Sequence, residues 1–198
     1  MKGRSAWFES FVFARRGTLL AIPAAALAVL GRPSAFSIAV GLPLAFAGEA
    51  IRAWAVGYSG VTTRSNAVEA PALVTAGPYA YVRNPLYLGN FVTAAGFAIA
   101  FTGGNAPPAR MLIVSGSLAV MLGVYSVIVP HEEAFLRAAF GVAFDAYAAR
   151  VPRVFPAFEP AGDQSGSYDP SVIGRAESRT FVTLGAMLAV LALKARQA

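Results

Sequence analysis

The feature that most constrains this chain is a series of long apolar segments that carry almost no charge. Five such segments can be read, and they are residues 16–30, 34–56, 86–102, 111–130 and 180–193. About 20 apolar residues are needed to cross a bilayer, so the second and fourth are long enough alone, whereas the first and last are short. Only 13% of the residues are charged, about half the share usual in a soluble domain. The sequence therefore predicts an all-α integral membrane helical bundle with about five transmembrane helices.

The formal net charge of +6 does not indicate a nucleic-acid-binding protein here. The arginines lie at the ends of apolar segments and in two polar stretches, where cytoplasmic orientation and anionic lipid headgroups account for them. The absence of cysteine excludes disulfides, thiolate metal sites and cysteine nucleophiles, and a single histidine, His131, argues against a histidine-based metal site. We therefore expect membrane lipids as partners, no nucleic acid and no metal; the oligomeric state stays open.

The connections between the apolar segments predict a topology. The amino end resembles a signal peptide but lacks a good cleavage site, so we expect a retained first helix. Short turns at residues 31–33 and 103–108 join the first two segments and the middle two. If the basic amino end is cytoplasmic, alternation places both turns outside and both long polar stretches, residues 57–85 and 131–179, inside. We expect one domain over residues 1–198, with its motifs in 47–156, a connector at 157–179 and a last helix at 180–194.

The first candidate site is the segment 77–89, with the sequence GPYAYVRNPLYLG, where a polar stretch enters the third apolar segment. Pro85 suits the first turn of a helix, and Asn84 before it is a good N-cap. Such a helix start favours an anion, and the tyrosine rings offer faces to a base or a sulfonium. The alternative is an interfacial aromatic belt in which Arg83 only reaches lipid headgroups. The residues alone leave both interpretations open.

Two adjacent carboxylates, Glu132 and Glu133, directly follow the fourth apolar segment. At a membrane boundary they can neutralise a cationic ligand, although on a helix they point about 100° apart. The alternative is the ordinary enrichment of acidic residues in the first turn of a helix. Within the second apolar segment, Glu49 and Arg52 stand three residues apart, which predicts an ion pair or else a substrate-pocket wall.

A third motif, residues 140–153, combines aromatic and basic side chains. Its spacing places Phe140, Phe144 and Tyr147 on one face of a short amphipathic helix that ends before Pro152 and could lie on the membrane. Arg150 and Arg153 at its end are candidates to bind an anionic substrate or cofactor carboxylate, with lipid phosphate as the simpler ligand.

The order of these motifs is more specific than any one of them. Gly-Pro-Tyr and Arg-x-Pro-x-Tyr-x-Gly enter one helix, Glu-Glu-x-x-Leu follows the next, and an aromatic segment ends in Val-Pro-Arg. Together they resemble the isoprenylcysteine carboxyl methyltransferases and their phospholipid-methylating relatives, over about residues 47–156. The resemblance implies S-adenosylmethionine as cofactor, held by cytoplasmic loops, short helices and the inner helix ends, and a lipophilic acceptor that enters from the bilayer.

Carried over by position, the resemblance implies roles for individual residues. Glu133 or Glu132 would hold the amino group of the cofactor, and Arg153 would lie near the acceptor. We expect all three residues to take part in catalysis. Substrate-binding residues are expected among Glu49, Arg52, Arg150 and Arg153. The cofactor would be lined by Tyr79, Arg83, Asn84, Pro85, Tyr87, Leu88, Gly89, His131 and Glu133. Asn84 departs from the histidine of the prenylcysteine enzymes, so an acid–base role at this position is in doubt.

The acceptor class stays open between a prenylcysteine-like carboxylate and a phospholipid-like amine. A carboxylate needs no general base, whereas an amine must lose a proton, which Glu132 or Glu133 could accept. Two other functions remain as alternatives. One is an NADPH-dependent membrane reductase of the sterol reductase type, which shares a similar Arg-x-Pro-x-Tyr motif but is much longer. The other is a non-enzymatic membrane subunit.

Overall fold

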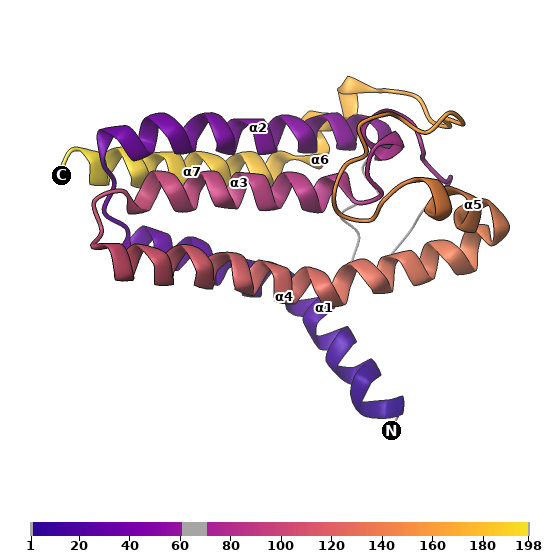
Figure 1. Ribbon diagram of the computed structural model, residues 1–198, viewed down its shortest axis with the longest axis horizontal. Helices are drawn as coiled ribbons and strands as arrows, with labels where there is room; N and C mark the ends of the chain where they lie inside the picture. Colours follow the sequence, from indigo (N-terminus) through magenta and orange to yellow (C-terminus); the bar gives the residue numbers. More distant parts are fainter. Residues whose placement is uncertain (1, 61–70, 198) are drawn as a thin grey trace. The chain divides into compact units, whose positions relative to one another are not determined.

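The computed structural model describes residues 2–60 and 71–197, with the backbone alone for residues 2–10. All regular elements in this part of the chain are helices (Figure 1). The long ones are α1 (Lys2–Leu30), α2 (Ala35–Ser59), α3 (Pro85–Thr102), α4 (Pro107–Phe140) and α7 (Ser178–Ala195). The short ones are η2 (Gly77–Ala80), α5 (Val142–Arg150), η3 (Pro170–Val172) and α6 (Ile173–Ala176). The predicted all-α class is confirmed.

Five of these helices are long and apolar enough to cross a membrane, among the residues that the structure describes. They are the apolar stretch Phe11–Leu30 of α1 and the whole of α2, α3, α4 and α7. Each corresponds to one of the apolar segments predicted from the sequence. The chain is therefore a multi-pass membrane protein. Of the predicted cytoplasmic stretch 57–85, residues 61–70 lie outside the described part.

The prediction that the fourth helix ends at Pro130 is wrong. Helix α4 continues through Pro130 to Phe140, so Glu132 and Glu133 lie on its last turns and not in the first turn of a new helix. A proline interrupts one backbone hydrogen bond of a helix, which membrane helices tolerate when other groups satisfy the freed carbonyl. Pro23 and Pro43 likewise lie inside α1 and α2.

The helices divide into two compact units, the first made of residues 1–49, 90–128 and 180–198. Its apolar core takes side chains from α1, α2, α3 and α7 and consists of Leu27, Ala45, Phe97, Ala98, Ala100, Phe101, Met187 and Leu191. Helices α2 and α3 approach closely, because a Cβ on Gly41 or on Gly96 would overlap the backbone of the other helix. The small residues thus allow the close packing of membrane helices.

Hydrogen bonds hold the two short turns of this unit together. Asn105 accepts from the backbone N–H of Arg32 at 2.8 Å and donates to the carbonyl of Leu30 at 2.9 Å. Lys194, near the end of α7, donates to the carbonyls of Val29, in the last turn of α1, and Gly31, just after that helix. If the five spans alternate in direction, the end of α1, the turn between α3 and α4 and the end of α7 lie on the same side of the membrane. The hydrogen bonds that join these three segments agree with this topology.

The second unit consists of residues 50–89 and 129–179. Its small core comprises Phe144, Tyr147 and Val151, against which Leu73, Leu136, Phe140, Ala148 and Ala161 pack. The predicted short helix exists as α5 and ends before Pro152, but Phe140 belongs to α4 and is separated from α5 by Gly141. Phe144 and Tyr147 are buried in protein, which corrects the expectation that their face lies on the membrane.

Candidate functional site

The motif segment 77–89 forms a tight turn followed by the start of α3. Gly77 has a φ of 62°, a conformation that side chains with a Cβ rarely adopt. A Cβ at this position would also overlap the ring of Tyr58. Helix α3 begins at Pro85, as predicted, and the carbonyl of Asn84 accepts from the N–H of Leu88 in its first turn. The glycine and the proline thus fix where the polar residues between them stand.

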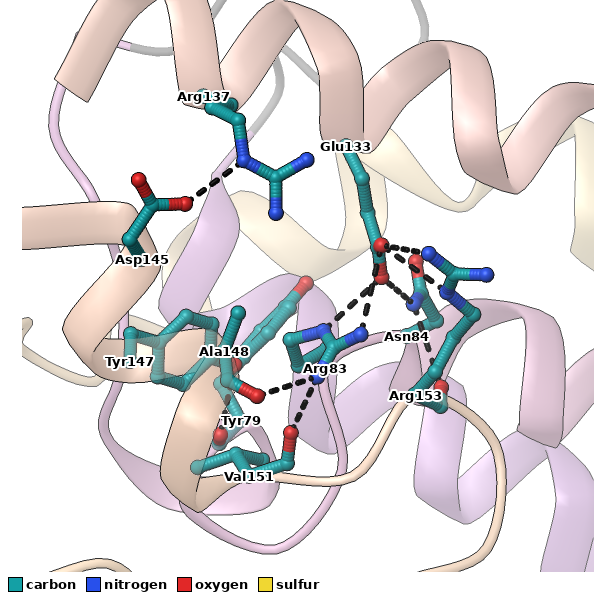
Figure 2. Close-up of polar contacts among 10 residues, drawn as sticks. All are labelled: Tyr79, Arg83, Asn84, Glu133, Arg137, Asp145, Tyr147, Ala148, Val151 and Arg153. Carbon is teal, nitrogen blue, oxygen red and sulfur yellow. Dashed lines mark hydrogen bonds and ion pairs between the residues drawn. The ribbon is translucent and has the colours of Figure 1, made fainter. Parts of the chain in front are cut away.

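Figure 2 shows that the carboxylate of Glu133 is the centre of a polar cluster built from three segments. Arg83 donates to it from Nε at 2.9 Å and from a terminal nitrogen at 3.4 Å. Asn84 donates at 3.1 Å, and Arg153 donates two bonds, at 3.0 and 2.6 Å. We call these four residues, Arg83, Asn84, Glu133 and Arg153, the Glu133 cluster. Two guanidinium groups meet one carboxylate, so the cluster carries a net charge of about +1.

Arg83 also fastens the end of α5. Its other terminal nitrogen donates to the carbonyls of Ala148, at 2.9 Å, and Val151 (Figure 2). The side chain of Arg83 therefore joins α4, the end of α5 and its own loop. The alternative in which Arg83 only reaches lipid headgroups is excluded, because its guanidinium is largely buried among protein acceptors.

Arg153 and Asn84 complete the cluster from its more exposed side. The side chain of Asn84 also donates to the carbonyl of Arg153 at 3.2 Å. The Glu133 carboxylate raises the pKa of Arg153 by accepting its hydrogen bonds, so this guanidinium stays charged. Its side chain remains about half exposed, and it is therefore the member of the cluster that an anionic ligand could reach.

Two tyrosines support the turn before the cluster. The hydroxyl of Tyr147 on α5 donates to the carbonyl of Tyr79 at 2.8 Å (Figure 2). Burial raises the pKa of Tyr79 to about 12 and raises that of Tyr147 as well. Both phenols therefore stay neutral at physiological pH. The hydrogen bond from Tyr147 was not predicted, because the sequence indicates only its aromatic face.

A second segment of the chain lies alongside the motif segment and is hydrogen-bonded to it. The N–H of Arg83 donates to the carbonyl of Pro152, Ala157 donates to Tyr81, and Ala161 donates to Ala80, each at 2.9 Å. Thr75 and Ser165 continue the pairing through backbone and hydroxyl bonds. Residues 152–165 thus run antiparallel to residues 75–83, and the start of the predicted connector is part of the support of the site.

The remaining residues expected to line the cofactor lie nearby along α3 and α4. Tyr87 donates its hydroxyl to Glu132 at 2.7 Å. Glu132 and Glu133 thus take different partners, as their separation around the helix predicts. Pro85 and Gly89 are buried, Leu88 is half-buried, and His131 is exposed on α4.

Three residues expected to bind substrate contact other partners. Arg52 makes a buried ion pair with Glu177, in which one terminal nitrogen donates to both carboxylate oxygens at 2.8 Å, and Arg150 pairs with Asp163. Glu49, in the first unit, accepts from Thr93 at 3.1 Å. The pairing of Glu49 with Arg52 stays a prediction. No sequence signal identifies Glu177 as the partner of Arg52, because 125 residues separate them.

Comparison of the sequence with models of protein families shows to which family the chain belongs. The sequence model of the phospholipid methyltransferase family matches residues 36–143, more than half of the chain. The chain belongs to this family. The match includes Arg83, Asn84 and Glu133, whereas Arg150 and Arg153 lie beyond its end. No curated protein and no solved structure matches the chain. The family resemblance predicted from the motifs is thus confirmed, and it makes the protein a member of a family of membrane methyltransferases.

Proposed function

We propose that the protein transfers a methyl group from S-adenosylmethionine to a lipophilic acceptor, with its active site at the Glu133 cluster and the start of α3. The observation that carries the proposal is the convergence of Arg83, Asn84, Glu133 and Arg153 from three segments in a member of the phospholipid methyltransferase family. Buried charges are costly unless they are paired, and their gathering in one place is typical of functional sites.

The residues around the cluster fit the chemical groups of the cofactor. Arg153 is half exposed on a cluster with a net positive charge, which suits a carboxylate. Trp54 and Tyr81 form a tilted aromatic pair with ring centroids 6.4 Å apart, which suits a base or a sulfonium. Glu132, held by the hydroxyl of Tyr87, suits an ammonium group. We propose that these residues hold S-adenosylmethionine.

Glu133 itself has little capacity left for a ligand. Its carboxylate accepts five hydrogen bonds, and a carboxylate offers about four lone-pair sites. A direct contact between Glu133 and the cofactor ammonium therefore requires Arg153 to move. We propose that Glu133 acts chiefly as a positioning residue and that Glu132 is the carboxylate nearer the cofactor.

S-adenosylmethionine supplies an electrophilic methyl group on a sulfonium. The residues of this chain would contribute by binding, orienting and excluding water, which are the main requirements of an in-line displacement. An amine acceptor must also lose a proton, and Glu132 is our candidate base. A carboxylate acceptor needs no base. Replacement of Glu132 by Gln is therefore expected to impair amine methylation more than carboxylate methylation, measured with phosphatidylethanolamine and a prenylcysteine as labelled-methyl acceptors.

We further propose that the amino terminus and the second unit face the cytoplasm. The excess of arginine in the polar stretches supports this orientation, since basic residues favour the cytoplasmic side. The natural chain has no cysteine, so single cysteines can be introduced for labelling. A cysteine at Gln164 should resist an impermeant reagent added to sealed cells, and one at Ala106 should react. The opposite pattern would reverse the orientation.

Calorimetric titration of the purified protein with S-adenosylmethionine, its demethylated product and NADPH tests the cofactor. We expect micromolar binding of the first two and none of NADPH. Binding of NADPH alone would support the reductase alternative, and binding of none of the three would support a non-enzymatic subunit. Either result would overturn the proposal.

Matched variants test the position of the site. Tyr87→Phe removes the bond to Glu132 and should weaken cofactor binding several-fold, and Glu132→Gln should weaken it further. Arg137→Gln is the control, because Arg137 lies on the same helix but pairs with exposed Asp145. Equal affinities in all three variants would show that the cofactor binds elsewhere.

A further inference from the structure

The loop that follows α5 presents large apolar side chains to the outside of the protein. Phe155 is 82% exposed and Phe158 is 104% exposed, and Val154 beside them is also exposed. We call residues 153–158 the aromatic loop. In contrast, Phe144 and Tyr147, the aromatic residues of α5, are buried. The exposed aromatic surface therefore belongs to the loop and not to the helix before it.

The backbone of the aromatic loop is held at both sides. Pro152, just before the loop, accepts from the N–H of Arg83, and Ala157 within it donates to the carbonyl of Tyr81. Ala161, just after it, donates to Ala80. These bonds fix the path of the chain around Phe155 and Phe158. Their exposure is therefore a property of a hydrogen-bonded loop.

The same hydrogen bonds locate the loop relative to the membrane. Its partners, Ala80, Tyr81 and Arg83, stand within five residues of Pro85, where the apolar helix α3 begins. Because α3 is apolar enough to span a bilayer, residues just before it lie at the membrane surface. The aromatic loop, bonded to them, lies at that level too.

Basic side chains precede the two phenylalanines of the loop, and one acidic residue follows them. Arg150 and Arg153 stand before Phe155, and Glu159 stands directly after Phe158. Both arginine side chains are about half exposed, although Arg150 pairs with Asp163 and Arg153 with Glu133. Aromatic side chains that insert between headgroups, flanked by basic ones that contact phosphate, are typical of segments bound in the membrane interface.

We propose that the aromatic loop inserts Phe155 and Phe158 into the interfacial region of the phospholipid bilayer. The ligand is the bilayer surface itself, with apolar acyl chain around the rings and phosphate near the arginines. Insertion would brace the segment that carries Arg153 against the membrane. The inference concerns membrane contact and does not rest on methyl transfer.

A single tryptophan in the loop tests the proposal. In the full chain, Trp7 and Trp54 are replaced by Phe, and Phe158→Trp provides the only indole. The protein is reconstituted in vesicles of phosphatidylcholine brominated near the headgroup end of its acyl chains. The matched control is Gln164→Trp in the same background, because Gln164 is exposed farther along the same connector.

We expect bromine to quench Phe158→Trp several-fold more strongly than Gln164→Trp, with emission shifted to the blue. Equal, weak quenching in both variants would place the loop in water and overturn the proposal. Blue-shifted emission without quenching would mean that protein, such as a second copy of the chain, covers the rings, and would overturn it equally. If Phe158→Trp fails to fold, Phe155→Trp gives the same reading with the same outcomes.

Discussion

The two arginines of the Glu133 cluster offer a test of what decides the strength of an ion pair in this protein. Distance and solvent exposure rank them in opposite orders. Arg153 lies closer to the Glu133 carboxylate, at 2.6 and 3.0 Å, than Arg83 does, at 2.9 and 3.4 Å. Yet the side chain of Arg83 is 12% exposed and that of Arg153 is 47% exposed, against 4% for Glu133.

The perturbation is a pair of double-mutant cycles with Glu133→Gln, Arg83→Gln and Arg153→Gln. Breaking a buried pair by removing one partner costs roughly 3–5 kcal/mol, because an unpaired charge stays buried. A pair with an exposed partner contributes about 1 kcal/mol or less, since water can solvate that partner. We therefore expect a coupling free energy of about 3 kcal/mol between Glu133 and Arg83 and about 1 kcal/mol between Glu133 and Arg153.

The measurement is the free energy of unfolding of each variant in mixed detergent micelles, followed by circular dichroism during titration with a denaturing detergent. The cycle removes the contribution of the bonds from Arg83 to the carbonyls of α5, because these bonds are lost equally in the single and the double variant. A larger coupling for Arg153 than for Arg83 would refute the reasoning, since distance and not exposure would then set the strength of the pair.

Two further predictions concern the turn before the cluster. Gly77→Ala should lower the free energy of unfolding by about 2 kcal/mol or more, because it combines a left-handed φ with an overlap on Tyr58; Gly162→Ala, whose Cβ meets nothing, is the control, and similar losses in both would contradict the explanation. Burial raises the pKa of Tyr79 from 10.0 to about 12, so the stability that this neutral phenol contributes is complete below pH 10 and lost as the pH rises to 12. Tyrosinate absorbance measures this directly, and ionisation of all seven tyrosines near pH 10 would contradict it.

Apolar length predicted the fold well because a bilayer leaves few alternatives to a helix of about 20 residues. Two of the five predicted segments reach that length by themselves, and in the structure the others also belong to helices long and apolar enough to cross a membrane. The predicted end of the fourth helix at Pro130 is wrong. A proline usually signals a helix end in water, whereas here α4 continues for another ten residues to Phe140. The sequence could not predict the partner of Arg52 either. The bond to Glu177 depends on tertiary packing, which no local pattern encodes.

The sequence indicates which segments carry the candidate site residues, but not the contacts between their atoms. The family resemblance implies that Arg83, Asn84, Glu133 and Arg153 belong to one site, and in the structure these four residues are joined by hydrogen bonds. Their roles in a site stay a prediction. What each carboxylate does was left open, because adjacent residues on a helix differ only in direction. The continuation of α4 gives Glu133 the arginines and Glu132 the hydroxyl of Tyr87.

The different partners of Glu132 and Glu133 predict different effects of their substitution on stability and on cofactor binding. If Glu133 is a positioning residue, Glu133→Gln should lower the free energy of unfolding. It should weaken cofactor binding only indirectly, because the segments that Glu133 holds together become looser. Glu132→Gln, by contrast, should weaken cofactor binding with little loss of stability, because it removes the charge of a half-buried carboxylate outside the Glu133 cluster but keeps an oxygen that accepts from Tyr87. The family resemblance alone assigns the amino group of the cofactor to either carboxylate, whereas stability and affinity, measured on the same two variants, tell the two roles apart.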